Sequence, residues 1–302
     1  MYSLDDCVRQ LENLGCLCER NVSMKEYTTF RIGGRASALV KPSTIHQVSN
    51  IYACCSQHQI PVYLIGKGSN VLVSDNGVNG VVIVLSGDFS GISLEDDTTL
   101  VCEAGAPLSK VCRFAEEHAL SGLEFAYGIP GTVGGAVFMN AGAYGGEMQD
   151  VVTSCMHVSP DGTTAVLSRK ELDFSYRHSV YSEGSNCIVE VRLKLFQGDR
   201  QEISEKMNSF LNRRKEKQPL DYPSAGSTFK RPKGGYASAL IDSCGLKGLR
   251  YGGAMVSTKH AGFVINTGDA TSEDVEHLIC SIKQIVYEQT GFQLEEEIKR
   301  IP

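Results

Sequence analysis

Residues 128–146 read Gly-Ile-Pro-Gly-Thr-Val-Gly-Gly-Ala-Val-Phe-Met-Asn-Ala-Gly-Ala-Tyr-Gly-Gly, a concentration of small side chains. Each glycine inside a helix or strand costs roughly 0.5–1 kcal/mol, so such a run needs an offsetting cause. Close approach of the backbone to a large flat or phosphorylated ligand supplies one, and a purely structural glycine-rich loop is the alternative. Thr132 and Asn140 can add directed hydrogen bonds. We therefore predict that Gly128–Gly135 forms part of a cofactor cradle.

A second glycine segment, Gly66-Lys67-Gly68-Ser69-Asn70, directly follows the apolar run Val62–Ile65. A loop after a buried strand presents backbone N–H groups without bulky side chains, which suits a pyrophosphate. It matches neither common nucleotide motif, because a P-loop would need Ser or Thr at Gly68 and a Rossmann fingerprint would need glycine at Val71. A plain tight turn is the alternative interpretation.

The chain of 302 residues is long enough for two or three packed units, and its 42% hydrophobic and 21% charged content is typical of a folded globular protein. The formal charge of −6 argues against nucleic acid or an anionic membrane as the main partner. No stretch reaches the ~18 apolar residues of a membrane span, and Met1–Asn21 lacks the apolar core of a signal peptide.

Eleven cysteines occur as an odd set without framework spacing or a Cys-x-x-Cys pair, at positions 7, 16, 18, 54, 55, 102, 112, 155, 187, 244 and 280. This usage favours reduced, mostly buried thiols and a cytoplasmic location. The seven histidines are scattered, so the sequence predicts no metal site.

The hydrophobic pattern alternates between strand and helix periods and predicts an α+β chain with boundaries near residues 90 and 200. A tight turn is expected at Asp75-Asn76-Gly77. Helices are expected near 4–14, 44–58, 107–118, 201–216, 236–243 and 272–289. Strands are expected at 62–65, 81–85, 100–103, 151–158, 164–167, 187–196, 263–266 and 294–301.

The two glycine segments, the Asn-Ala-Gly-Ala-Tyr-Gly-Gly run and residues 27–34 (Tyr-Thr-Thr-Phe-Arg-Ile-Gly-Gly) resemble the UDP-N-acetylenolpyruvoylglucosamine reductases, the MurB family. The resemblance runs from about Tyr27 to Ile301. It implies a fold of the vanillyl-alcohol-oxidase-like superfamily, with FAD-binding subdomains at 1–90 and 91–200 and a substrate-binding α/β domain at 201–302.

The resemblance also implies an activity: reduction of UDP-N-acetylglucosamine enolpyruvyl ether to UDP-N-acetylmuramate, with non-covalent FAD and NADPH, in peptidoglycan precursor synthesis. The expected partner is thus a UDP-sugar, and the expected state is a monomer or weak dimer. NADH remains open as an alternative reductant. The residues expected to bind FAD are Gly66, Lys67, Gly68, Ser69, Asn70, Gly128, Ile129, Pro130, Gly131, Thr132, Gly134, Gly135 and Asn140.

Ser175-Tyr176-Arg177-His178-Ser179 is a compact polar stretch, which by itself is typical of a solvated loop. The family motif Tyr-Arg-x-Ser implies that Arg177 is catalytic, and a guanidinium is suited to bind a carboxylate and stabilise an enolate. Tyr176 is expected to contact substrate.

Residues 223–232 contain an Ala-Gly-Ser turn, which without the resemblance is an ordinary serine-rich turn. The resemblance implies that Ser227 is the proton donor, a role that requires neighbours to stabilise the alkoxide. Lys217 and Lys230 are expected to bind substrate. The family often has asparagine where Arg231 stands, so the role of Arg231 is open.

Leu294-Glu295-Glu296-Glu297-Ile298 resembles the family pattern that ends in a catalytic carboxylate, which implies that Glu297 has this role. Glu295 would share its strand face by the period of two and stays an alternative. Glu296 is interpreted as part of a solvated face.

Only about eight residues separate Ser179 from the strand at Ile188, so the chain resembles the shorter subtype that lacks a tyrosine-bearing insertion. Two other functions are considered. One is an alcohol or sugar oxidase on the same FAD scaffold, and the other is a non-catalytic flavin- or nucleotide-binding module. Neither explains Arg177, Ser227 and Glu297 together, which are expected to converge beside the flavin.

Overall fold

The computed structural model describes residues 3–302, so Met1 and Tyr2 of the predicted N-terminal segment lie outside the described residues. The chain forms two compact units, each built from separated stretches of sequence. Unit 1 comprises residues up to Arg20, Ala38–Lys67 and Asn79–Arg213. Unit 2 comprises Asn21–Ser37, Gly68–Val78 and Arg214–Pro302.

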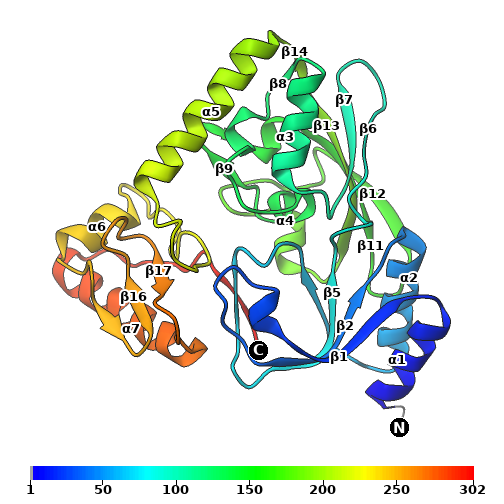
Figure 1. Cartoon of the computed structure of the whole chain (residues 1–302), viewed down its shortest axis with the longest axis horizontal. Helices are drawn as coiled ribbons and strands as arrows, with labels where there is room; N and C mark the ends of the chain where they lie inside the picture. Colours follow the sequence, from blue (N-terminus) through cyan, green and yellow to red (C-terminus); the bar gives the residue numbers. More distant parts are fainter. Residues whose placement is uncertain (1–2) are drawn as a thin grey trace. The chain divides into compact units, whose positions relative to one another are not determined.

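The first sheet has the strand order β1-β2-β5-β3, with β3 and β5 parallel and Tyr63 opposite Val82. The centre of β5 is an unbroken buried run, Val81–Val84, as expected for a strand covered on both faces. The strands are β1 (Leu17–Ser23), β2 (Arg35–Lys41), β3 (Val62–Ile65) and β5 (Val78–Val84). Helices α1 (Leu4–Asn13) and α2 (Ile45–Gln57) lie side by side at the start of unit 1 (Figure 1).

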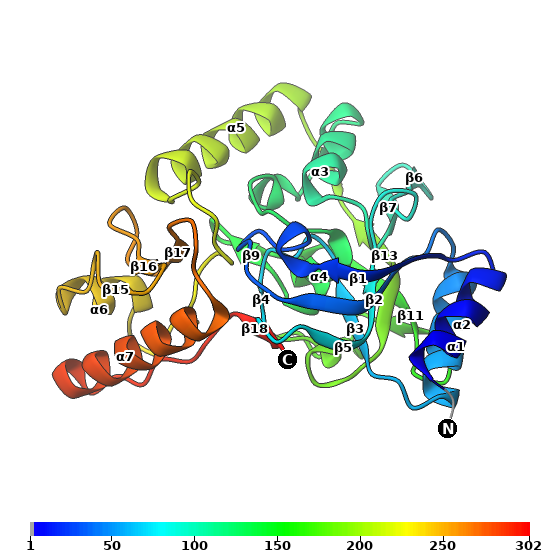
Figure 2. The same ribbon diagram turned by 60° about the horizontal axis from the view of Figure 1, so that its bottom comes forward.

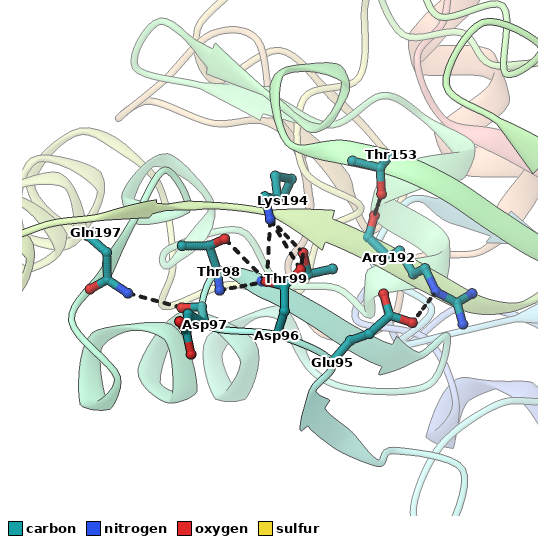
Figure 3. A network of polar contacts seen from close by, with 9 residues as sticks. All are labelled: Glu95, Asp96, Asp97, Thr98, Thr99, Thr153, Arg192, Lys194 and Gln197. Atoms are coloured by element: carbon teal, nitrogen blue, oxygen red, sulfur yellow. Dashed lines mark hydrogen bonds and ion pairs between the residues drawn. The ribbon is translucent and has the colours of Figure 1, made fainter.

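The second sheet of unit 1 has the order β12-β11-β13-β7-β6 and is antiparallel throughout. Its strands are β6 (Ile92–Leu94), β7 (Thr99–Glu103), β11 (Val152–Val158), β12 (Thr164–Ser168) and β13 (Cys187–Lys194). A polar network closes the β6–β7 turn onto β13 (Figure 3). In it the Thr98 and Thr99 amides donate to Asp96 at 2.8 Å, and Lys194 pairs with the same carboxylate at 3.3 Å. The Thr98 amide, above all, holds the pKa of Asp96 well below its ordinary value.

The rest of unit 1 consists of helices and short ladders around the glycine-rich segment. These are α3 (Leu108–Glu117), β8 (Leu120–Ser121), α4 (Val133–Phe138), β9 (Gly142–Ala143), β10 (Gly146–Glu147) and β14 (Phe196–Gln197). Helix α5 (Arg200–Lys217) passes from unit 1 into unit 2. Short 3-10 turns occur at Met24–Glu26, Glu124–Ala126, Met148–Asp150 and Val180–Glu183.

Unit 2 has its own core around Phe30, Ile241 and Ile279. Helix α7 (Ser272–Thr290) packs beside a small antiparallel sheet, β15-β16-β17, as Figure 2 shows. The sheet comprises β15 (Arg250–Tyr251), β16 (Ala254–Val256) and β17 (Val264–Asn266), and α6 (Ala237–Ser243) also contacts α7. The chain ends in β18 (Lys299–Ile301), which pairs in parallel with β4 (Val71–Val73).

All six predicted helices are present within one residue or two of the expected bounds. The capping box of Thr271 with Asp274 and the left-handed Gly291 at the end of α7 are confirmed, as is the turn closed by Gly77 N–H and the Ser74 carbonyl at 3.1 Å. Eight of the eleven cysteines are buried, which confirms the expectation of mostly buried thiols. Burial raises the pKa of both Cys102 and Cys155 to about 12.

One prediction about local structure was wrong, and two strands were missed. The expected strand 294–301 is regular only over Lys299–Ile301, and Glu296 forms an isolated bridge with Phe229. The run of small residues was expected to need an offsetting cause inside a helix; helix α4 includes Gly134 and Gly135, and the Thr132 side chain caps it by accepting from the Gly135 N–H at 3.4 Å. Strands β1 and β2 were not predicted, and β1 has no fully buried side chain to mark it.

Candidate active site

The two glycine segments meet within unit 1. A Cβ placed on Gly66 would collide with the hydroxyl oxygen of Thr132, so the Gly66 backbone lies against the Thr132 side chain with no room for a side chain of its own. Gly66 directly follows strand β3, and Thr132 directly precedes helix α4. The contact therefore lies between the end of a strand and the start of a helix. Whether the two segments cradle FAD stays a prediction.

Packing within the protein explains why glycine is required at one position of the second segment. The Gly134 N–H donates to the Ala104 carbonyl at 2.9 Å, and a Cβ on Gly134 would lie 2.7 Å from the Ala104 Cβ. The N–H of Val133 likewise donates to the Ala106 carbonyl at 2.9 Å. Gly134 is therefore required by packing against the residues that follow β7, a cause that the sequence did not reveal.

Arg177 lies in a two-residue turn, because Ser175 and His178 exchange backbone hydrogen bonds of 3.2 Å. Its backbone is left-handed, with φ of +57°, a conformation that costs a non-glycine residue about 1–2 kcal/mol. Its guanidinium lies 5.0 Å from the Tyr176 ring centre and donates to the Gly142 carbonyl at 3.3 Å. The structure thus brings the predicted catalytic arginine to the Asn-Ala-Gly-Ala-Tyr-Gly-Gly run.

Asn140 is fully buried, and its side chain makes three hydrogen bonds within the protein. It donates to the Ser175 carbonyl at 2.9 Å and to Glu147 Oε2 at 3.2 Å, and accepts from the Gln149 N–H at 2.9 Å. These bonds occupy both amide hydrogens, so its carboxamide has no donor left for a cofactor. The predicted contact of Asn140 with FAD is untested. Both side-chain donors of Asn140 already bond within the protein, which argues against such a contact.

Ser227 and Glu297 belong to two paired segments of unit 2. The Glu297 N–H donates to the Thr228 carbonyl at 2.9 Å, and the Lys230 N–H donates to the Glu295 carbonyl at 2.8 Å. Thr228 is fully buried, and its hydroxyl accepts from the Val264 N–H at 3.0 Å. Sequence reasoning missed Thr228, which fixes the backbone beside both predicted catalytic residues.

The second half of the first glycine segment lies beside this ladder. Asn70 donates its side-chain amide to the Glu297 carbonyl at 3.1 Å, and its own carbonyl accepts from the Lys299 N–H at 2.9 Å. A Cβ on Gly226 would lie 3.9 Å from the Ser69 carbonyl oxygen. Ser69 and Asn70, predicted to bind FAD, are therefore next to the predicted acid and carboxylate.

The three successive glutamates have different surroundings. Glu295 is 76% exposed and pairs with Lys230 at 3.4 Å. Glu296 was interpreted as part of a solvated face, which is wrong: its side chain is only 20% exposed and pairs with Lys283 at 3.3 Å and Arg300 at 3.0 Å. Glu297 is half-buried beside Thr228. The surroundings of Glu295 are those of a surface ion pair, which leaves Glu297 as the better candidate.

The predicted substrate residues lie in both units. Tyr176 of unit 1 is half-exposed, and Lys217 of unit 2 is exposed at the end of α5. Lys230 is half-buried, and burial together with the charge of Lys230 lowers the pKa of neighbouring Lys299. The guanidinium of Arg231 lies 4.5 Å from the Tyr236 ring centre, so it has a structural contact where the family often has asparagine.

The residues of the cradle fit a flavin dinucleotide. Within unit 1, the Gly66 backbone lies against the Thr132 hydroxyl, and exposed backbone N–H groups beside a hydroxyl suit a pyrophosphate. No group of three or more His, Cys, Asp or Glu within residues 3–302 is arranged to hold a metal ion. No helix in the same range is long and apolar enough to span a membrane.

Comparisons with known proteins agree with this chemistry. A family model described as "FAD binding domain" matches residues 36–168, and one described as "UDP-N-acetylenolpyruvoylglucosamine reductase, C-terminal domain" matches residues 218–301. Curated proteins named UDP-N-acetylenolpyruvoylglucosamine reductase are similar over most of their length. The one from Caldanaerobacter subterraneus is 48% identical over 92% of both chains. The one from Clostridioides difficile is 45% identical over 91% of this chain and 90% of its own.

Solved structures extend the comparison to the fold. The crystal structure of MurB from Thermus caldophilus covers 95% of this chain and 100% of its own, with a TM-score of 0.82 and 38% identity. A chitooligosaccharide oxidase covers 97% of this chain and 60% of its own, with a TM-score of 0.50 and 14% identity, which shows a likeness of fold alone.

Proposed function

The chain belongs to the UDP-N-acetylenolpyruvoylglucosamine reductase family, and from that premise we propose how its residues divide the work of the reaction. It is an FAD-dependent oxidoreductase of peptidoglycan precursor synthesis, with NADPH as reductant. Bound FAD, which the residues of the two glycine segments would hold, would supply the hydride chemistry between NADPH and the vinyl terminus of the enolpyruvyl ether. The adjacent carbon then gains a proton, so the product is UDP-N-acetylmuramate.

Arg177 and Glu297 act on the carboxylate end of the substrate. Hydride addition at the vinyl terminus pushes negative charge onto the substrate carboxylate, which becomes enolate-like. The Arg177 guanidinium binds that carboxylate and stabilises the growing charge. Glu297, in the C-terminal segment that pairs with Thr228, polarises the double bond of the substrate. The left-handed turn of Arg177 supports this role, because backbone strain is concentrated at functional sites.

Ser227 donates the proton. A hydroxyl is a weak acid, so its donation requires neighbours that stabilise the alkoxide or return a proton to it. The left-handed Gly226, with φ of +76°, precedes Ser227, and the buried Thr228 fixes the backbone after it. These two neighbours hold the hydroxyl on a rigid support.

The chain divides by ligand into the subdomains 1–90 and 91–200, which hold FAD through the two glycine segments, and 201–302, which holds the UDP-sugar. Tyr176, Lys217 and Lys230 bind substrate, the lysines by pairing with its phosphates. The enzyme works in the cytoplasm as a monomer or weak dimer.

One observation supports this assignment most. In each unit a predicted catalytic residue lies beside a glycine segment: Arg177 donates to Gly142, and Glu297 accepts from Asn70 through its carbonyl. Binding alone gives no reason for a fixed arginine, serine and carboxylate near flavin-binding loops. An oxidase on the same scaffold has no use for Ser227.

The test uses the purified protein under anaerobic conditions. It should be yellow, NADPH should bleach the flavin absorbance, and the enolpyruvyl nucleotide should restore it with formation of UDP-N-acetylmuramate. Recovery of colour by oxygen alone, at the same rate with or without that nucleotide, would identify an oxidase instead.

A further inference from the structure

The Arg177 turn needs a cause, because its conformation is unfavourable in isolation. The turn has arginine at a position with φ of +57°, where glycine is the usual residue. The two hydrogen bonds of 3.2 Å across it close the turn but do not fix it to the rest of the unit. Something outside the turn must hold it in place.

Asn140 supplies that attachment. Its side-chain amide donates to the Ser175 carbonyl at 2.9 Å, one residue before Tyr176, and its second hydrogen goes to Glu147. Its carbonyl oxygen accepts from the Gln149 N–H at 2.9 Å. Asn140 is itself left-handed, with φ of +40°, a conformation that asparagine tolerates better than most residues. A side chain that is 0% exposed and bonded in three directions is a rigid anchor.

A second attachment follows the turn. The hydroxyls of Ser179 and Ser182 both donate to the Phe138 carbonyl, at 2.8 Å and 3.0 Å. This attachment is shared between two donors, so the loss of one leaves the other. The bond from Asn140 to Ser175 comes instead from a single donor, and it reaches the backbone of the turn itself.

We propose that Asn140 is a positioning residue for Arg177: its buried carboxamide holds the Ser175–His178 turn in the conformation that presents the guanidinium beside Gly142. The inference rests on the role proposed above for Arg177. It assigns Asn140 to the reoxidation of the flavin by substrate rather than to the binding of FAD. Small displacements of a reacting group can cost 10²-fold in rate, so the anchor matters although both of its side-chain donors bond within the protein.

The experiment compares Asn140→Ala with Ser182→Ala as the matched control, using holoenzyme and stopped-flow flavin absorbance. For Asn140→Ala, bleaching by NADPH and the dissociation constant of FAD should stay within about threefold of the original, while reoxidation by the enolpyruvyl nucleotide should slow by about 10–10². Ser182→Ala should leave both rates nearly unchanged. Equal losses in both half-reactions, or a large loss of FAD affinity, would overturn the proposal.

Asn140→Asp gives a second test of the proposed role of Asn140, and this test remains usable if Asn140→Ala does not fold. It keeps the volume and the acceptor for Gln149, but its carboxylate cannot donate to Ser175. Burial beside Glu147 raises the pKa of such a carboxyl, and its protonated form regains one donor. Its reoxidation rate relative to the original enzyme should therefore recover in part between about pH 7 and pH 5. A constant ratio across that range would contradict the proposal.

A double variant separates this proposal from the proposed function. If Asn140 acts through Arg177, Asn140→Ala should add little to the loss already caused by Arg177→Ala. Losses that multiply in the double variant would show that Asn140 acts independently. If Arg177→Ala alone leaves reoxidation unchanged, the proposed role of Arg177 fails, and the anchor has nothing to position.

Discussion

The protein supports its predicted catalytic residues in two different ways. The Arg177 turn is held by side chains, through the carboxamide of Asn140 and the hydroxyls of Ser179 and Ser182. The Ser227 and Glu297 segments are held mainly by main-chain pairing, in which the Glu297 N–H donates to Thr228 and the Lys230 N–H donates to Glu295. The first support can be removed by substitutions that leave the chain path intact, whereas the second is largely independent of which side chains are present.

This difference teaches where distant substitutions should matter. A left-handed arginine stores strain that only its neighbours oppose, so a change at Asn140 reaches Arg177. Main-chain pairing does not depend on the Ser227 or Glu297 side chains. Substitution of either side chain should therefore leave the backbone in place and measure the catalytic contribution of that side chain alone. Four predictions test this contrast, from the largest expected effect to the smallest.

Ser227→Ala should have the largest effect. The ladder uses the main chain of Thr228 and Glu297, so the backbone should keep its path without the Ser227 hydroxyl. Bleaching by NADPH should survive, while reoxidation by the enolpyruvyl nucleotide should slow by about 10²–10⁴, the span for a positioned acid. Anaerobic stopped-flow absorbance measures both rates, and an unchanged reoxidation rate would exclude Ser227 as the donor.

Glu297→Gln and Glu295→Gln form a pair that distinguishes the two carboxylates. The half-buried Glu297 should lose about 10²-fold in reoxidation rate when its charge is removed. Glu295 makes an exposed pair with Lys230, and such pairs are worth about 0–1 kcal/mol, so its variant should stay within about fivefold. The reverse order of effects would move the catalytic role to Glu295.

Gly68→Ala and Gly145→Ala compare one glycine from each unit, and both glycines have a backbone conformation that is unfavourable for alanine. Both have positive φ, +62° and +89°, but a Cβ on Gly68 would collide with the Tyr27 carbonyl, whereas one on Gly145 would meet nothing within 4 Å. Gly145→Ala should therefore destabilise by about 1–2 kcal/mol and Gly68→Ala by about 3 kcal/mol. Urea unfolding at fixed FAD concentration measures both, and equal losses would show that the collision is relieved at little cost.

Two histidines should give the smallest effect, the buried His157 in unit 1 and the half-buried His260 in unit 2. Burial lowers the pKa of His157 in unit 1 and of His260 in unit 2 below the ordinary 6.5, and Lys247 adds to the shift at His260. In the unfolded chain both take up protons at higher pH than in the fold, so stability is fully present above about pH 6.5 and falls as pH decreases through the folded pKa values. His260 Nδ1 also accepts from the Gly262 N–H at 3.2 Å, a bond that protonation removes.

The measurement is the urea midpoint between pH 7 and pH 5. His260→Gln should reduce the acid-induced decrease, and His157→Phe should reduce it separately because the two side chains lie in different units. A decrease of the original size in both variants would assign the acid sensitivity to other groups.

Much of the fold could be predicted from sequence because its signals are local. The capping box at Thr271, Gly291 after α7 and the apolar stripe between them predict one helix without tertiary information. Strand β1 gave no such signal, because none of its side chains is fully buried. Helix α4 was not predicted, because part of the offset for its glycines is the packing of Gly134 against Ala104, which sequence does not reveal.

Sequence motifs predicted which residues form the candidate site, but not the hydrogen bonds that hold those residues in place. Arg177, Ser227 and Glu297 stand in short motifs, so the resemblance predicts a catalytic role for each of them. The left-handed backbone of Arg177 and the role of Thr228 depend on hydrogen bonds to residues far away in sequence, such as Ser175 to Asn140 and Thr228 to Val264. The pairing of Glu296 with Lys283 and Arg300 is equally non-local, which is why a solvated face was the wrong interpretation.

The parallel pairing of β4 with β18 has a consequence for synthesis on the ribosome. Residues 71–73 emerge early, but their partners, residues 299–301, are made more than two hundred residues later. At about 5–20 residues per second, β4 waits roughly 10–45 s for this neighbour. During that interval the edge and the apolar side chains of Leu72 and Val73 are exposed to other nascent chains. Unit 2 should therefore be the part of the molecule that most needs a chaperone, and folding yield should respond to translation speed.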